Sequence, residues 1–448
     1  MLVLCCLMRQ TVSFESLSSF SRDGRLLRIM SATQNTDTAI VKRITTILFV
    51  TKSLHSTAIV GLLTVTPIIA VNLTGNDMAV GLPATLVLIG RAMAAYPVGW
   101  LMDRLGRRLG LNVGFLVAIF GMSLGAIAVV NGLLWLFLSG SFFLGMSRSA
   151  VEQMRFIAAE VQPVGRRAQA IGLIAFSSTI GSLAGSLLMD TSPTLTVLLG
   201  VPILAVPFIM AIGLMFVGIT LNQLFLRPDP LLISRQMEAN NKETEAEEIG
   251  RARSMVQIFS QYPVILAASV MAISWLGMTV VMQVTPLFMN YEGYDVPIIA
   301  RAVMIHSLGM FAFSSGTGWL TSRIGRLPVV AIGIVLLIVS GISGCFADTL
   351  ITLYIAVFLL GVGWNFCYIA GSAMLSDQLR PEERGRAQGV SEAFIGVTAA
   401  IGSVTSGLVY ANYGYTGSNL IVIGLSVLLF VILAFLGRPS MQTSGAVS

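Results

Sequence analysis

The sequence predicts an all-α membrane protein, because its composition is too apolar for a soluble fold and long apolar runs recur along it. Of its 448 residues, 55% are hydrophobic and 11% are charged, and the mean hydropathy is +0.85. Soluble domains carry about a quarter charged residues. This chain therefore has too few polar groups to cover a folded surface in water, which excludes a soluble enzyme. The net charge of +6 is too small and scattered for a nucleic-acid surface.

Twelve apolar runs are long enough to cross a bilayer, which takes about 20 residues of helix. They must be helices, because an exposed backbone amide finds no partner in lipid. The third and fourth runs are separated only by Asn131 and Gly132, so their division is the least distinct. In chain order the predicted spans are 44–71, 79–101, 110–130, 133–157, 168–188, 198–225, 258–289, 297–321, 327–346, 350–375, 388–410 and 416–437.

Polar segments divide these spans six and six. Residues 1–41 are Ser/Thr-rich without helical periodicity, so we expect a disordered tail, with Met30 as an alternative start. The first ten residues, MLVLCCLMRQ, lack the basic leading region and small-residue cleavage site of a signal peptide, so we do not expect one. The expected divisions after this tail are a bundle at 42–226, a charged linker at 227–257, a second bundle at 258–437 and a tail at 438–448.

The loops on the two sides of the predicted membrane differ in charge. Lys and Arg gather in one alternating set, with the tails and the linker, whereas the other set is mainly acidic. Because cytoplasmic loops are enriched in Lys and Arg, we expect both termini in the cytoplasm and the chain in a cell membrane. The basic loops hold Arg104, Arg107, Arg108, Arg166, Arg167, Arg323, Arg326, Arg380, Arg384 and Arg386, and the acidic ones hold Asp77, Asp190, Glu292, Asp295 and Asp348.

The two sets of spans resemble each other at a nearly fixed offset. Ordered matches of this kind predict two parallel six-helix bundles related by a pseudo-two-fold axis along the membrane normal, as in one class of secondary transporter. A duplicated scaffold without transport is the alternative. The matches are Val65-Thr66-Pro67 with 284–286, Gly99-Trp100-Leu101 with 318–320 and Arg167-Ala168-Gln169 with 386–388, all 219 positions apart, and Asn72-x-x-Gly75-x-Asp77 with 290–295, 218 apart.

The loop after the second span carries a specific motif. Residues 99–108 read GWLMDRLGRR, which resembles the cytoplasmic loop signature of the major facilitator superfamily, G-x-L-x-D-R-x-G-R-R. A weaker copy, GWLTSRIGR, occupies residues 318–326. The resemblance covers about residues 42–437. The predicted gating residues are Gly99, Asp103, Arg104, Gly106, Arg107 and Arg108 in the first copy and Gly318, Arg323, Gly325 and Arg326 in the second.

The residues of this motif suggest a lock on one face of the protein. Gly99 is expected to let helices approach closely, and Gly106 to permit a tight turn. Asp103 among arginines can form a charge cluster that must break for this face to open, although the arginines alone could simply enforce topology. Ser322 replaces the acid in the second copy, so we expect the second loop to keep its shape and lose the strong lock.

The resemblance also implies how such a protein works. It implies that the first, fourth, seventh and tenth helices line a cavity, and that the two halves rock to expose it to either side. The family's antiport signature, G-x-x-x-G-P-x-x-G-G, is degenerate here. Gly181 and Gly185 are present, but Ser186 replaces the proline. The many Met, Gly and Phe residues still resemble drug-exporter-like members.

Charged residues inside a span are costly and therefore candidate site residues. Arg148, Glu152 and Arg155 share one face of the fourth span, and the first two have the spacing of an ion pair. We expect a role in substrate binding or proton coupling, with a structural pair as the alternative. Arg91 lies about 15 Å deep in the second span, and its alternative roles are binding of substrate or of a buried acid and a structural one.

The remaining candidates carry weaker signals. Glu392 starts the eleventh span, where it pairs with nearby arginines or is an exposed helix-start acid. His55 shares a face with Lys52, which is shallow enough to snorkel to the surface. His55 can take up a proton near neutral pH or be a hydrogen-bonded spectator, as can His306. Trp364, Asn365 and Tyr368 on the tenth span form either a wall for a flat organic solute or ordinary packing.

These features together predict a secondary active transporter of small organic solutes. No ATP-binding sequence, catalytic cluster or metal-ligand spacing is present, so we expect neither an enzyme nor a cofactor. We expect a monomer in lipid, with protons as the coupling ion. Efflux of amphipathic compounds is slightly favoured over uptake of a nutrient or vitamin, and the excess of buried arginine suggests a neutral or anionic cargo. A sensor or scaffold without transport is the alternative of another class.

Overall fold

The computed structural model describes residues 24–163, 166–241, 253–379 and 384–436. Their regular structure is entirely helical, which confirms the predicted all-α fold. The chain divides into two units, residues 1–43 and 44–448. In the first unit the described residues, 24–43, are helical although the sequence predicts a disordered tail there. The second unit contains all the other helices.

The helices of the first half run from α1 to α9. They are α1 (Gly24–Thr74), the short 3-10 helix η1 (Asp77–Gly81), α2 (Leu82–Leu105), α3 (Arg107–Asn131), α4 (Leu134–Glu152), α5 (Met154–Glu160), α6 (Arg167–Met189), α7 (Ser192–Leu199), α8 (Val206–Phe225) and α9 (Pro230–Asn241). Those of the second half are α10 (Met255–Phe259), α11 (Tyr262–Tyr291), α12 (Val296–Phe311), α13 (Ser314–Ile324), α14 (Arg326–Cys345), α15 (Leu350–Asp377) and α16 (Arg384–Leu436).

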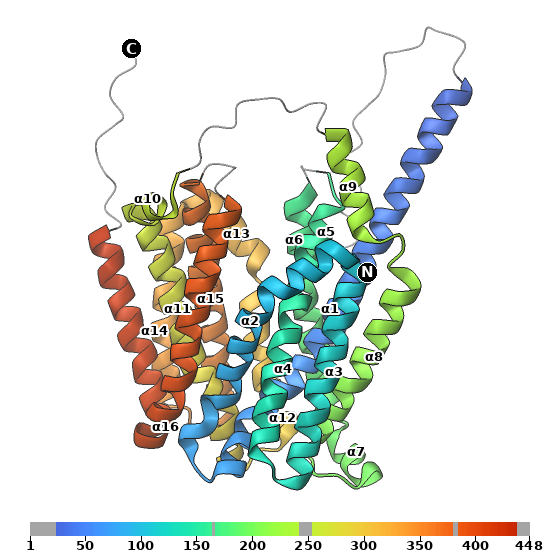
Figure 1. The fold of residues 1–448 in the computed structure, drawn as a ribbon. Coiled ribbons are helices and arrows are strands. Elements are labelled where there is room, and N and C mark those ends of the chain that lie inside the picture. The colour runs from blue at the N-terminus through green and yellow to red at the C-terminus, as the bar shows by residue number, and fades with distance from the viewer. Residues whose placement is uncertain (1–23, 164–165, 242–252, 380–383, 437–448) are drawn as a thin grey trace, which may run out of the picture. The chain divides into compact units, whose positions relative to one another are not determined.

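The predicted spans correspond to these helices. Eleven helices of the described part are long and apolar enough to cross a membrane. The last of them, within α16, contains two predicted spans, because the backbone leaves helical geometry at Gly414, with φ 63° and ψ −162°. The chain reverses there, so that the two arms of α16 run in opposite directions (Figure 1). Gly132, in the left-handed region, likewise ends α3 and confirms that the third and fourth spans are separate.

The sixth span begins later than predicted. The sequence predicts a span from residue 198, but α7 ends in a left-handed turn at Gly200 and α8 begins only at Val206. Pro202 and Pro207 lie on either side of this start. Proline is favoured where a helix begins, because the N–H group that it lacks would have no intrahelical partner there. The polar linker also differs from a plain connection, because its first part forms α9.

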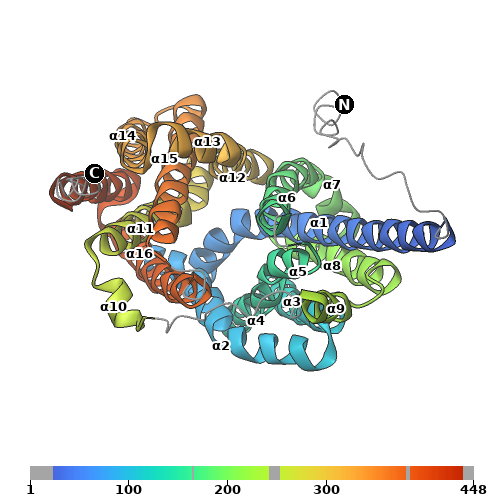
Figure 2. The same ribbon diagram turned by 90° about the horizontal axis from the view of Figure 1, so that it is seen from above.

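The internal repeat recurs in the backbone. Gly106 and Gly325, at equivalent places in the two motif copies, have φ values of 98° and 93°. Gly75 and Gly293 have φ values of 66° and 81°. Seen from above, the helices of the first half, blue to green, and those of the second, yellow to red, form two groups (Figure 2). The fold is therefore the predicted pair of six-helix bundles.

Both halves contribute to a tight contact at the end of the molecule that holds η1. Tyr291 donates a hydrogen bond to Asp77 Oδ1 over 2.6 Å, and Arg301 pairs with Asp190 over 2.9 Å. Ser403 Oγ donates to the Gly81 carbonyl over 2.8 Å. A side chain at Gly81 would collide with the backbone of residue 403. The halves are therefore closed against each other at this end, which is opposite the loop at Gly106.

Candidate functional site

A single carboxylate organises the polar centre of the first half. Glu152 is the last residue of α4, just before the division from α5 at Gln153. Lys52 Nζ, from α1, lies 3.2 Å from Glu152 Oε1, and Arg148 Nε lies 3.9 Å from the same atom. The predicted Arg148–Glu152 pair is thus present but is the longer of the two. Lys52 is 8% exposed, so the prediction that it snorkels to the surface is wrong. Its ammonium instead meets a carboxylate, which lowers the cost of burial.

More cations surround this carboxylate. Arg91, from α2, and Arg155, from α5, are both near enough to act electrostatically on Glu152. Arg155 Nε is buried without a hydrogen-bond acceptor, and its guanidinium lies 4.8 Å above the Phe156 ring. His55 is 4% exposed, one turn along α1 from Lys52. The cluster therefore carries more positive than negative charge and has an unmet donor.

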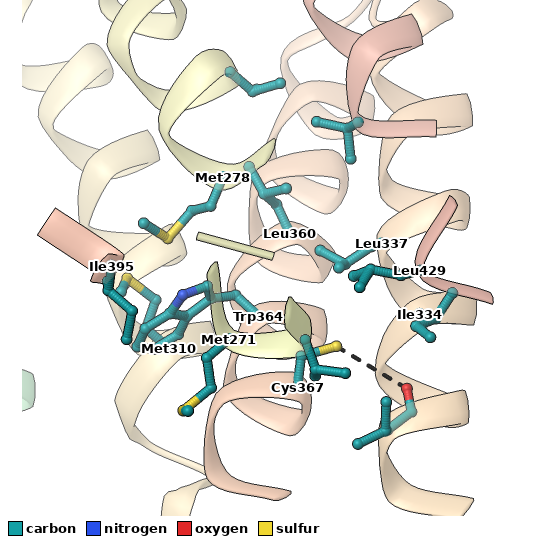
Figure 3. Packing of buried hydrophobic residues seen from close by; sticks show 14 of the residues in the cluster. Met271, Met278, Met310, Ile334, Leu337, Leu360, Trp364, Cys367, Ile395 and Leu429 are labelled. Atoms are coloured by element: carbon teal, nitrogen blue, oxygen red, sulfur yellow. Dashed lines mark hydrogen bonds between the residues drawn. The ribbon is translucent and has the colours of Figure 1, made fainter. Parts of the chain in front are cut away.

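An aromatic layer occupies the second half. Trp364 and Tyr368 on α15 stack with centroids 4.8 Å apart and planes 14° apart, and Trp275 on α11 meets Trp364 edge-on at 4.9 Å. Trp364 is 3% exposed and its Nε1 has no acceptor. Its ring lies among Met271, Met278 and Met310 (Figure 3). Trp275 carries no sequence signal of its own, although it lies on a helix that is predicted to line the cavity.

Asn365 is buried and fully engaged in hydrogen bonds between helices of the second half. It is 1% exposed, and its amide nitrogen donates to Met310 O over 2.6 Å and to Ser314 Oγ over 2.9 Å. Thr317 Oγ1 donates to its amide oxygen over 2.6 Å. These bonds bridge the interruption between α12 and α13. His306 is similarly buried, with Nδ1 2.9 Å from Val357 O. Both side chains thus hold helices of the second half together.

The repeat relates the charged cluster to the aromatic layer. Subtracting the offset of 219 from Trp275, Trp364 and Tyr368 gives Ser56, Gly145 and Ser149. These three positions lie three or four residues from Lys52, Arg148 and Glu152, respectively, which is about one helical turn. The two halves thus place different chemistry on equivalent helices, at depths that differ by about one helical turn. Charges occupy the first half and aromatic rings the second.

The first copy of the loop motif forms an ion-pair network at the other end of the first half. Arg107 pairs with Asp103 over 2.8 Å and with both carboxylate oxygens of Glu160, each over 3.1 Å. Glu160, at the end of α5, could not be predicted from the motif because it lies 53 positions from Arg107. The network joins the ends of α2, α3 and α5, so that the loop is held by all three helices.

The second motif copy keeps part of this arrangement. Arg326 pairs with Asp377, at the end of α15, over 2.9 Å, as Arg107 does with Glu160. Ser322, in the place of Asp103, donates to the Gly318 carbonyl within its own helix. Arg104 and Arg323 lie over the rings of Trp100 and Trp319, at 4.5 and 5.1 Å. The second loop therefore keeps the shape and one ion pair but lacks the counterpart of Asp103.

Three predicted features have different outcomes. A methyl group at Gly99 would meet no atom within 4 Å, so the close approach predicted there is absent. By contrast, Gly181 and Gly185 of the degenerate antiport segment lie directly against Ser56 and Thr57 of α1. Glu392 lies outside the residues whose side chains the structure describes.

Comparisons with known proteins agree with this architecture. The profile of the Major Facilitator Superfamily matches residues 48–316 and 273–446. The chain is 33% identical over 377 residues to an uncharacterized MFS-type transporter, YdeG of Bacillus subtilis (strain 168), covering 83% of this chain and 86% of that protein. It is 27% identical over 410 residues to the riboflavin transporter RfnT of Brucella anthropi, covering 90% and 98%.

Solved structures share the fold. A partially occluded inward open conformation of the xylose transporter XylE from E. coli matches with a TM-score of 0.67 at 14% identity, covering 92% of this chain and all of that one. The nucleoside transporter NupG matches with a TM-score of 0.63 at 14% identity, covering 89% and all of it. At these identities the likeness extends to the fold alone.

Proposed function

The chain belongs to the major facilitator superfamily, a family of membrane transporters, and we propose that it carries a flat heteroaromatic solute with a polar or anionic chain. The observation that carries this proposal is the placement of cations on α1 and α4 of the first half and of aromatic rings on the equivalent helices of the second, within about one helical turn in depth. The solute would lie between them, and its ring would stack on the layer of Trp275, Trp364 and Tyr368. Its polar chain would meet Arg148, Arg155 and Lys52.

The charge of the cluster supports a solute that accepts hydrogen bonds. Lys52 and Arg148 lie within 4 Å of Glu152, Arg91 and Arg155 add positive charge that acts on it, and Arg155 Nε has no acceptor in the described residues. Burying a hydrogen-bond donor without a partner destabilises the protein, and a bound solute that supplies an acceptor would remove this cost. Trp364 Nε1, in the aromatic layer, is likewise buried without a hydrogen-bond acceptor. Both groups favour a solute with acceptors at its ring and along its chain.

The relatives support a vitamin-like solute more than a drug. The riboflavin transporter aligns over 90% of this chain. The multidrug resistance protein MdtL of Vibrio parahaemolyticus, 23% identical, aligns over only 32%. The antiport segment has Ser186 where the signature has proline. We therefore place uptake of a flavin-like solute first, and keep efflux of amphipathic compounds as the second candidate because of that partial match.

We further propose that protons drive transport through Glu152. A proton on this carboxylate would remove the negative partner of Lys52 and Arg148, and the freed cations could then take the solute. Alternating access would follow from opening of the contact at Asp77 and Tyr291 while the end at Asp103 closes. In this proposal the protein acts as a monomer in the cell membrane, with both termini in the cytoplasm.

The test is solute accumulation in right-side-out and inside-out vesicles. A panel of riboflavin, nucleosides, an amphipathic cation and a sugar is offered with and without a proton gradient. We expect riboflavin to accumulate in right-side-out vesicles when the gradient is directed inward, and this accumulation to fall at least tenfold in Arg148→Met. Gradient-driven movement of the amphipathic cation alone, in the opposite direction, would favour the second candidate.

A further inference from the structure

The linker between the halves begins with a carboxylate that caps a helix of the gating motif. Asp229, just before α9, accepts hydrogen bonds from the backbone N–H groups of Arg107 and Arg108, each over 3.0 Å. It also accepts one from Leu231 N over 2.9 Å. A carboxylate at a helix N-terminus satisfies otherwise unpaired donors and interacts favourably with the helix dipole. Asp229 thus supplies from 121 positions away the cap that α3 lacks locally.

The turn of the gating loop is shaped to this carboxylate. Gly106 has a φ of 98°, a conformation that side chains disfavour, and a Cβ built there would lie 2.5 Å from Asp229 Oδ2. A glycine is therefore required at position 106 for two reasons: it can adopt the positive φ, and it leaves space for the carboxylate of Asp229. Gly325 has a similar φ, but a Cβ there would meet only Pro328, at 3.8 Å.

The same segment contacts the other members of the gate. Arg235 on α9 donates to the Asp103 carbonyl over 3.4 Å, and α9 packs against α3 and α5 (Figure 2). These are the helices that the Arg107–Glu160 pair joins. Leu226, where α8 ends, is fully buried, which fixes the start of the segment. The beginning of the linker therefore supports the gating loop from behind.

The two bundles end in similar short sequences that differ at the position of Asp229. Phe225-Leu226-Arg227-Pro228-Asp229 ends the first bundle, and Phe435-Leu436-Gly437-Arg438-Pro439-Ser440 ends the second, 210 to 211 positions on and with one residue inserted, outside the constant offset of the repeat. In this local alignment serine stands in the place of Asp229, as Ser322 stands in the place of Asp103 in the second motif copy. Residues 438–440 lie outside the described residues. Both acids are present where the lock is predicted and both are serine where it is degenerate.

We propose that Asp229 is a positioning residue of the gate, which holds the start of α3 so that Arg107 can present Asp103 to the opposite half. The proposal rests on the alternating access proposed above. Without Asp229, the first turn of α3 would lose two of its hydrogen bonds. The backbone at Arg107 would then no longer be held in a fixed position. Closure of the gate would then be less favourable, although the solute site is untouched.

The test measures gate closure without any solute. Spin labels are placed at positions 105 and 324, which are exposed and equivalent in the two halves, in full-length protein whose native cysteines are replaced. We expect Asp229→Ala to lower the population with the short distance by about three- to tenfold, as loss of a helix cap would. Asp229→Ser, which can still accept one hydrogen bond, should lose less. Glu238→Gln removes one negative charge from the same helix α9 and serves as the control.

Transport provides the second readout. In Asp229→Ala and Asp229→Ser, the maximal rate of riboflavin uptake per folded molecule should fall while KM stays within about twofold, because the gate and not the solute site is affected. Wild-type distances in both Asp229 variants, or an equal change in Glu238→Gln, would overturn the proposal. The distance measurement needs no solute. If the proposed solute class is incorrect, no riboflavin uptake will be measured, but the distances will still test the role of Asp229.

Discussion

Single ionic contacts set the chemistry of the first half at the residue scale. Glu152 meets Lys52 at 3.2 Å and Arg148 at 3.9 Å inside a span, where a charge without a partner is costly. The four-residue spacing predicted the longer of these pairs because both residues lie on one helix. It could not predict the shorter pair, because Lys52 lies 100 positions away on α1 and only packing of α1 against the other helices brings it to Glu152.

Removing one partner of the Lys52–Glu152 pair should cost more than removing both. We expect Lys52→Met to reduce the stability of the purified protein by up to about 3 kcal/mol, because it leaves Glu152 with its longer contact only. Lys52→Met combined with Glu152→Gln should recover most of this loss. Thermal unfolding in detergent gives the comparison, and Arg148→Met is the matched single variant. A larger loss in Arg148→Met than in Lys52→Met would show that the 3.9 Å pair is the important one.

Glu152 should be needed for coupling but not for exchange. Glu152→Gln cannot take up and release a proton, so we expect it to abolish proton-driven accumulation while riboflavin on the two sides of the membrane still exchanges. Vesicles with and without an inward proton gradient separate the two activities. Full gradient-driven accumulation in a well-folded Glu152→Gln protein would end the coupling role.

At the scale of elements, the loops at residues 99–108 and 318–326 could be predicted from the sequence only in part. The motif predicted the glycine turn and the acid among arginines, and the repeat predicted the second loop. The structure adds Glu160 and Asp229, which lie on α5 and before α9 and reach the loop only through the packing of helices. Neither has a fixed spacing from the motif. The prediction at Gly99 failed because the neighbouring helix does not approach that side of α2.

Substitutions in the two loops should differ in effect. Asp103→Asn removes the ion pair with Arg107, and Arg107→Ala removes the contacts with both Asp103 and Glu160. We expect the uptake rate to fall at least fivefold in Asp103→Asn and further in Arg107→Ala, because more of the network is lost. Ser322→Ala loses only a bond within its own helix and should stay within about twofold of wild type. Equal damage from Asp103→Asn and Ser322→Ala would remove the asymmetry between the loops.

At the scale of the whole molecule, contacts between the two halves close the protein at the η1 end. Tyr291, Arg301 and Ser403 of the second half bond to Asp77, Asp190 and Gly81 of the first. The sequence predicted two related bundles, because apolar runs and repeated motifs are local patterns. It could not predict which end is closed, since that depends on the balance of contacts between halves rather than on either half alone.

Weakening this closure should shift the population of states. Tyr291→Phe removes the hydrogen bond to Asp77, and we expect the form open at this end to increase about two- to fivefold. Spin labels at Leu133 and Ile351, both exposed near this end, report the separation of the halves. Tyr413→Phe, at a residue that is 74% exposed, is the control. An unchanged distance distribution in Tyr291→Phe would mean that the packing around Gly81 holds the end closed by itself.

The orientation in the membrane has a direct chemical test. Single cysteines at positions 77, 292 and 348 should react with an impermeant thiol reagent on intact cells. Cysteines at positions 104 and 245 should react only after permeabilisation, because Lys and Arg mark the cytoplasmic loops. Labelling of position 245 from outside would reverse the proposed topology.

The measurement that tests the central claim most directly is the binding of two solutes that share a ring and differ in charge. Riboflavin and its 5′-phosphate are titrated into purified protein, and quenching of the flavin fluorescence gives each Kd. We expect Tyr368→Leu to weaken both solutes by a similar factor, because the ring stacks in the second half. Arg148→Met should weaken the phosphate-bearing solute at least tenfold more than riboflavin, because the first half binds the charge. Equal effects of Arg148→Met on the two solutes, or unchanged binding of both in Tyr368→Leu, would contradict a solute held between the cations of one half and the aromatic rings of the other.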